Sequence, residues 1–209
     1  MRPVGSGGRP VTAPETSEDA RRFGREVLVG QRVRLRAVEE DDLVRLAGWS
    51  SDPEWQPLQR VRVQPRPSGP MVDDLRQRSR NEDRADLLLL AVERREDGAL
   101  AGYVQLRETA TQHLSATLVI MLGPEMTGRG LGSDAVRVAL RYAFAVMGLN
   151  RVQLLSLSYN DRALRAYQRA GFVEEGRWRE AVYIDGGYAD QVMMSVLRRE
   201  WDQDRAPTS

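Results

Sequence analysis

The sequence predicts a mixed α/β fold in which one sheet carries flanking helices. Three patterns lead to this prediction: several segments alternate polar and apolar residues, a glycine-rich turn runs directly into a broadly apolar helix, and a further strand and helix follow. A strand, Gly-rich turn, helix, strand and helix placed beside an antiparallel meander form a mixed sheet. At about 100–200 residues per domain, we expect the 209 residues to form one domain with a sizeable core.

The N-terminal part of the chain alternates polar segments with short elements. Residues 1–26 are rich in Gly, Pro, Ser, Thr and charge, which predicts a flexible leader. Residues 31–37 alternate as a strand does, and residues 39–49 carry apolar side chains at helical spacing behind an acidic start. Residues 53–70 contain five prolines, which predicts an irregular loop before a short polar helix over 71–81.

A meander of three strands is expected next, over residues 86–93, 100–107 and 115–122. The first two strands are separated by a turn with Asp97-Gly98, a dipeptide typical of tight hairpins.

The C-terminal part of the chain completes the sheet. We expect a Gly-rich turn over 123–132, a helix over 133–147 ended by Gly148, a strand over 152–157, a helix over 161–170 ended by Gly171, and a closing hairpin from Phe172 with its turn at 185–187 and its last strand at 188–197. The folded domain is expected over residues 27–201 and a flexible tail over 202–209.

The composition excludes several chemistries. All 31 Lys+Arg residues are arginines, and the chain has no Cys and only one imidazole, His113. A thiolate nucleophile, a disulfide, a Cys-ligated metal, a Schiff-base lysine and a P-loop lysine are therefore excluded, and no metal site is expected. A net charge of +1 argues against a nucleic-acid or membrane partner, and the N-terminus has no apolar stretch typical of a secretory signal, so we expect a cytoplasmic protein.

The glycine-rich turn predicts an anion site. Gly128, Gly130 and Gly132 let the backbone curl and present N–H groups at a helix N-terminus, where the macrodipole also favours an anion. Arg129 adds a charged donor. A plain structural turn is the alternative interpretation.

The segment Asn160-Asp-Arg-Ala-Leu-Arg-Ala-Tyr167-Gln-Arg-Ala-Gly-Phe172 is the second informative motif. Together with the turn, it resembles the GCN5-related N-acetyltransferase (GNAT) superfamily. The resemblance extends to residues 30–43, 174–177 and 185–190, which are similar to the ribosomal-protein-alanine N-acetyltransferase (RimJ/RimL-like) branch. It covers about residues 28–201.

The resemblance implies a GNAT-like, mostly antiparallel twisted sheet, splayed between the strands at Ser115 and Val152, with acetyl-CoA as co-substrate. It also implies roles for individual residues. Ile120, Met121 and Leu122 would pair with the pantetheine arm, Thr127, Gly128, Arg129, Gly130, Leu131 and Gly132 would bind the pyrophosphate, Asn160 would lie near the thiol, and Tyr167 would protonate the departing thiolate.

The chain differs from related enzymes at the positions where they carry a general base. Related enzymes often carry a glutamate on a splayed strand, where this chain has Thr117 and Leu155. Glu54, Glu108 and Asp185 are unranked candidates for a base, and a water chain is the alternative.

Several residues have a plainer interpretation beside the functional one. Tyr167 is also consistent with a core aromatic, and Asn160 with a helix N-cap. His113 is expected to be an exposed turn residue. Trp49, Trp55 and Trp178 are candidates both for the acceptor pocket and for the core, and the arginines between Arg60 and Arg84 are either a solvated face or contacts for an anionic acceptor.

The resemblance therefore implies transfer of an acetyl group from acetyl-CoA to a primary amine, either a protein N-terminus or a small amine such as an aminoglycoside or polyamine. The alternative is a CoA-binding regulatory or structural module of the same fold. A homodimer is left open as the assembly.

Overall fold

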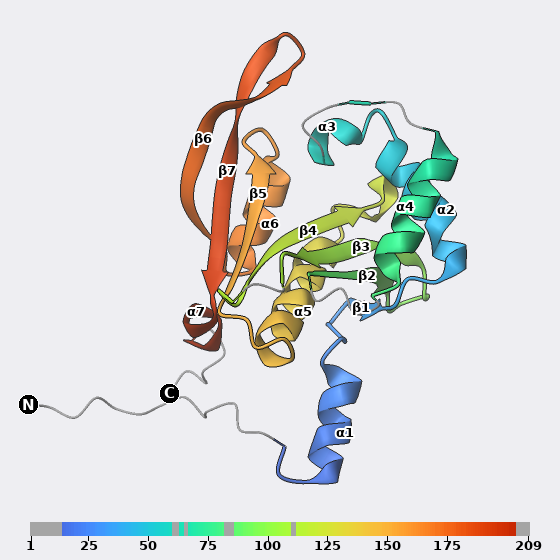
Figure 1. Cartoon of the computed structure of the whole chain (residues 1–209), viewed down its shortest axis with the longest axis vertical. Coiled ribbons are helices and arrows are strands. Elements are labelled where there is room, and N and C mark those ends of the chain that lie inside the picture. Colours follow the sequence, from blue (N-terminus) through green and yellow to red (C-terminus); the bar gives the residue numbers. More distant parts are fainter. Residues whose placement is uncertain (1–13, 60–62, 65–66, 82–85, 110–111, 204–209) are drawn as a thin grey trace, which may run out of the picture.

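The computed structural model describes residues 14–59, 63–64, 67–81, 86–109 and 112–203. Its centre is a seven-stranded sheet in the order β1-β2-β3-β4-β5-β7-β6 (Figure 1). The strands are β1 (Val33–Arg36), β2 (Leu87–Arg94), β3 (Leu100–Arg107), β4 (Ser115–Leu122), β5 (Arg151–Leu157), β6 (Val173–Ile184) and β7 (Gly187–Leu197). Among the strands of the described residues, only β4 and β5 pair in parallel, which confirms the predicted mixed, mostly antiparallel fold.

Helices cover both faces of the sheet. They are α1 (Ser17–Glu26), α2 (Glu40–Ser51), α3 (Gln56–Gln59), α4 (Ser68–Ser79), α5 (Leu131–Ala145), α6 (Asp161–Arg169) and α7 (Arg198–Gln203). One core lies between the sheet and α5, and a second lies between the sheet and α2 with α4. Among the described helices, none is long and apolar enough to cross a membrane.

The ends of the domain differ from the sequence prediction. Residues 17–26 of the expected flexible leader form α1, because the Thr16 hydroxyl caps the backbone N–H of Asp19 at 3.1 Å and ion pairs link successive turns. The helix buries none of its residues and projects from the sheet (Figure 1). Residues 1–13 and 204–209 lie outside the described part, whereas residues 202 and 203 of the expected tail belong to α7.

Two described parts of the proline-rich segment are helical. Residues 53–70 contain α3 and the start of α4, where the sequence predicted an irregular loop. Pro57 and Pro70 each lie within the first turn of a helix, where a backbone N–H has no intrahelical acceptor to lose.

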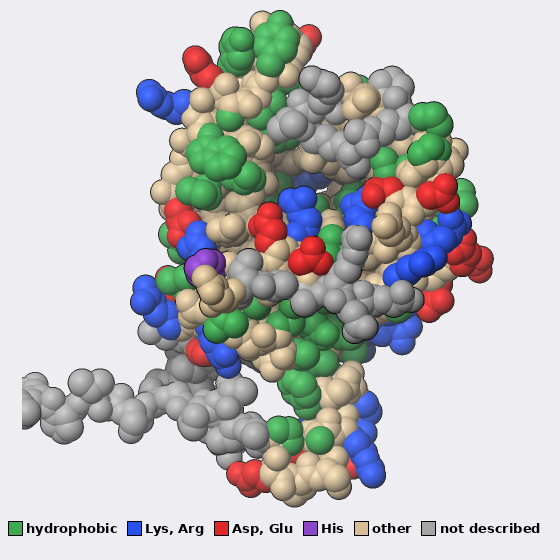
Figure 2. Space-filling model, viewed as in Figure 1, with side chains coloured by type: hydrophobic (Ala, Val, Ile, Leu, Met, Phe, Trp, Pro, Cys, Tyr) green, Lys and Arg blue, Asp and Glu red, His purple; other side chains and the backbone are tan. Residues whose placement is uncertain are grey.

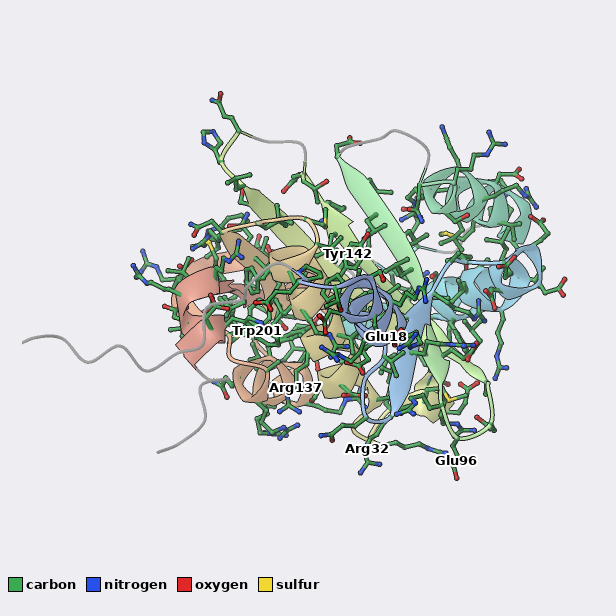
Figure 3. All side chains as sticks on the ribbon, turned by 90° about the horizontal axis from the view of Figure 1, so that it is seen from below. Glu18, Arg32, Glu96, Arg137, Tyr142 and Trp201 are labelled. Atoms are coloured by element: carbon green, nitrogen blue, oxygen red, sulfur yellow. The ribbon has the colours of Figure 1, made fainter. Side chains whose placement is uncertain are left out.

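Helix α5 is attached to the N-terminal strand by one buried carboxylate. Asp134 accepts hydrogen bonds from the backbone N–H groups of Gln31 at 3.2 Å, Arg32 at 2.6 Å and Val33 at 3.0 Å. Arg137 of the same helix donates to the carbonyl of Arg169 at 2.8 Å, which links α5 to the end of α6 (Figure 3).

Candidate active site

The turn between β4 and α5 exposes backbone donors. A short 3-10 helix, η1 (Pro124–Met126), is followed by Thr127, whose hydroxyl donates to the Pro124 carbonyl at 2.9 Å. Gly128 and Gly130 have φ values of +75° and +77°, a conformation that side-chain-bearing residues rarely adopt. Since Gly130 is the N-cap, the backbone N–H groups of the first turn of α5 are available to an anion.

A cavity of about 210 Å³ opens beside this turn. Nine residues expected from the sequence line it: Ile120, Met121, Leu122, Thr127, Gly128, Gly130, Gly132, Asn160 and Tyr167. Arg129 and Leu131 are not among them. The side chain of Leu131 is buried in the core, and Arg129 lines a separate hollow on the other side of the turn with Arg32 and Arg95. Figure 3 shows Arg32 and Glu96 at this edge of the molecule.

The segment that includes α3 forms one wall of the cavity. The indole N–H of Trp55 donates to the Leu122 carbonyl at 2.9 Å. The guanidinium carbon of Arg162 in α6 lies 5.1 Å from the centroid of the Trp55 ring. The Asn160 side-chain amide donates to the Leu58 carbonyl at 3.0 Å. Leu58 and Gln59, which line the cavity, were missed by the sequence analysis because only these tertiary contacts bring α3 to the site.

The sheet is split next to the cavity. Strands β4 and β5 pair only from Ser115 to Thr117 on one side and from Arg151 to Gln153 on the other, although both strands continue further (Figure 1). The predicted splay is thus confirmed. A second cavity of about 400 Å³ lies at the split, and it shares Ile120, Met121, Asn160 and Tyr167 with the first. The two cavities therefore meet at these side chains.

Tyr167 lies at the junction of the two cavities. Its ring packs against Phe172 at a centroid distance of 5.9 Å, and burial raises the pKa of its hydroxyl to about 12. In the described part of the chain, the hydroxyl has no hydrogen-bond partner, so it is free to donate to a ligand.

Asn160 caps a helix and also lines the cavities. Its side-chain oxygen accepts from the Ala163 backbone N–H at 3.2 Å, which caps α6, and the residue lines both cavities.

The candidate bases lie outside both cavities. Glu54 is exposed before α3, and Asp185 lies in the β6–β7 turn. Glu108 accepts a hydrogen bond of 2.6 Å from the Thr117 hydroxyl, which brings a carboxylate next to the strand position where related enzymes carry glutamate. Leu155, the other such position, lines the second cavity.

The histidine and the three tryptophans singled out in the sequence lie in different environments. His113 is exposed in a turn, as expected. Trp49 is 8% exposed in the core, Trp55 lines the first cavity, and Trp178 is 51% exposed on β6.

A split mixed sheet with a glycine-rich helix N-terminus at the split is the architecture that the sequence resemblance implied. Residues 32–173 match the acetyltransferase (GNAT) domain family. The chain belongs to this family.

Three similar proteins carry related names. The chain is 32% identical over 109 residues to the putative ribosomal N-acetyltransferase YdaF of Bacillus subtilis (52% of this chain, 60% of that protein) and 31% identical over 105 residues to spermidine N(1)-acetyltransferase of Escherichia coli (50% and 56%). The matches thus span about six tenths of the length of these curated relatives. A crystal structure of spermidine N-acetyltransferase from Vibrio cholerae in complex with CoA and spermine has a TM-score of 0.72 at 27% identity, covering 81% of this chain and 98% of that chain.

Proposed function

We propose that this protein transfers an acetyl group from acetyl-CoA to a primary amine. The observation that carries the proposal is the junction at Tyr167 and Asn160, where a cavity beside the glycine-rich turn meets a cavity at the split of the sheet. Two co-substrates that enter from different sides would meet there. A related structure contains CoA and spermine, an amine, in one complex.

The residues of the first cavity fit acetyl-CoA. The backbone N–H groups after Gly130 would bind the pyrophosphate, and the bare backbone at Gly128 lets a phosphate approach because no side chain shields it. The backbone from Ile120 to Leu122 would pair with the pantetheine arm along the unpaired side of β4.

The reaction needs no nucleophile from the protein. The amine nitrogen attacks the thioester carbon, a C–N bond forms, the C–S bond breaks, and the amine loses one proton while the thiolate gains one. A backbone N–H on the splayed strand would stabilise the oxyanion of the tetrahedral intermediate. Tyr167 would donate to the departing sulfur; its raised pKa of about 12 keeps the phenol protonated at neutral pH, as a donor must be.

Tyr167→Phe tests the assignment. We expect kcat for CoA thiol release, measured with acetyl-CoA and a panel of amines and N-terminal peptides, to fall by about 10²-fold or more with CoA affinity retained. Tyr142→Phe is the matched control, because Tyr142 lies on α5 outside both cavities (Figure 3). Equal kcat values for the two variants would contradict the proton-donor role.

A CoA-binding module without catalysis is the second candidate. It is favoured by one observation: Thr117 and Leu155 occupy the strand positions where related enzymes often carry glutamate. Thermal stabilisation by CoA without thiol release on any acceptor would support this module and contradict acetyl transfer.

The acceptor we favour is a protein N-terminus, as in the RimJ/RimL-like branch. The proposal includes a cytoplasmic location, where acetyl-CoA and new N-termini occur together. The similar proteins carry names of both ribosomal and spermidine acetyltransferases, so N-terminal peptides and polyamines belong side by side in the panel.

A further inference from the structure

The charge of the second cavity is unusual for a site that would receive an amine. Arg78 and Arg107 are among its lining residues, and no Asp or Glu of the described chain is. The remaining polar lining side chains include Gln105 and Gln191, which are neutral. Figure 2 shows a hollow in this face, between the β6–β7 side and the α3–α4 side, with charged side chains at its edge.

Arg107 carries the uncompensated charge. It is the last residue of β3, it is exposed, and it has no ion pair or hydrogen bond with any residue that the structure describes. Arg78 is different, since it forms an ion pair with Asp74. Glu108 follows Arg107, but its carboxylate accepts the Thr117 hydroxyl at 2.6 Å and does not line the cavity.

The position of Arg107 along the sheet sets the distance between the reacting amine of an acceptor and the acceptor group that contacts Arg107. Arg107 lies opposite Thr117 in the register, and Tyr103 lies opposite Met121. Ile120 and Met121 line both cavities, so the reacting carbonyl is expected beside them. Three to four residues of β4 separate these positions, which is about 10–14 Å at about 3.4 Å per residue.

We infer that the acceptor is an N-terminal peptide with an acidic side chain at its fourth or fifth residue, and that Arg107 binds this side chain. An extended peptide rises about 3.3 Å per residue, so three or four rises, about 10–13 Å, bring its fourth or fifth residue to Arg107 when its amine lies beside Ile120 and Met121. The carboxylate of a free amino acid is too close to its amine to span this distance. A polyamine would place further cations beside the Arg107 guanidinium, in a cavity without a carboxylate among the described lining residues.

This inference rests on the proposed acetyl transfer and names its acceptor. The test compares kcat/KM for four acceptors: spermidine and three pentapeptides that differ only in Glu, Gln or Lys at residue four. We expect the order Glu, Gln, Lys, with at least a tenfold difference between the Glu and Lys peptides and with spermidine below the Glu peptide. High salt should reduce this difference.

Variants of Arg107 make the test specific. Arg107→Gln should reduce the Glu-to-Lys ratio to near one, and Arg107→Glu should reverse it, which a folding defect does not do. Arg199→Gln is the matched control, because Arg199 is exposed in α7 without a described ion pair and lies outside both cavities.

The outcomes separate the two levels of the proposal. No thiol release with any of the four acceptors, while CoA still binds, overturns acetyl transfer and the acceptor class together. Turnover with equal kcat/KM for the Glu and Lys peptides, a preference for spermidine, or an Arg107→Glu variant that keeps the wild-type order overturns the acceptor class alone.

Discussion

Asp134, a buried carboxylate in the first turn of α5, is expected to contribute strongly to stability. It is 7% exposed and accepts three backbone N–H groups from the segment that leads into β1. The substitution Asp134→Asn keeps the size of the side chain and replaces one oxygen by an NH₂ group, which faces a donor. One hydrogen bond to a charged acceptor is lost, at about 2 kcal/mol, and the other two become neutral bonds, at about 1 kcal/mol together.

The expected loss is therefore about 3 kcal/mol in the free energy of unfolding. For a chain of this size, that corresponds to a fall in Tm of about 6–12 °C. Urea unfolding followed by circular dichroism measures the difference, with the slope against urea checked for equality between variants.

Asp161→Asn provides the control for this measurement. Asp161 lies in the first turn of α6, is exposed, and has no described ion pair. Like Asp134, it interacts favourably with a helix N-terminus, but it lacks the three hydrogen bonds of Asp134. That interaction contributes about 0.3–1 kcal/mol. If Asp134→Asn loses no more than the control, the three hydrogen bonds do not stabilise the fold as argued.

Three further predictions concern the cofactor side and the phenol. Gly130→Val should weaken CoA binding at least tenfold by calorimetry, because Gly130 has φ +77° at the turn, whereas Gly98→Val, at φ +73° in a hairpin away from both cavities, should leave CoA affinity unchanged. Arg129→Gln should weaken CoA binding by less than about tenfold, since Arg129 is exposed and lines the neighbouring hollow; a loss as large as that of Gly130→Val would contradict the placement. Since the pKa of Tyr167 is raised to about 12, its neutral form supports stability fully below pH 10 and that support falls as pH rises toward 12. The kcat profile should accordingly show no loss from phenol ionisation below about pH 10, and a tyrosine-dependent loss near pH 9 would contradict this.

The sheet and its main helices follow from local patterns. The strands over 100–107 and 115–122 have the predicted bounds, because short apolar runs between turn residues are a local signal. The first strand is buried at every residue except Arg107, whereas the second alternates over its first half. The splay was implied by the family resemblance and not by periodicity, and the three-residue pairing of β4 with β5 confirms it.

The missed helices have different causes. Helix α1 forms through the Thr16 cap and side-chain ion pairs without burying any of its residues, so hydrophobic periodicity gave no signal. The helix predicted over 71–81 is α4, but α3 and the first turn of α4 were missed, because the prolines in these first turns were counted as helix breakers.

The lining of the first cavity was predictable where it depends on one segment. The glycines of the turn and the Asn160–Tyr167 helix are local motifs, and the structure brings both to one cavity. The α3 wall depends on contacts such as that of Asn160 with the Leu58 carbonyl, across 102 positions of sequence, which no local pattern contains. The direction of Arg129 likewise depends on the path of the turn.

The three-residue pairing between β4 and β5 leaves two strand edges inside the sheet rather than at its rim. Beyond Thr117 and Gln153, the facing N–H and C=O groups of these strands have no partner strand on that side. The unpaired N–H and C=O groups of such an edge can form hydrogen bonds with another extended chain. A bound co-substrate with amides along its length would act as a short extra strand, so amide hydrogen exchange on β4 near Ile120 and Met121 should slow when CoA binds while exchange on β2 stays the same.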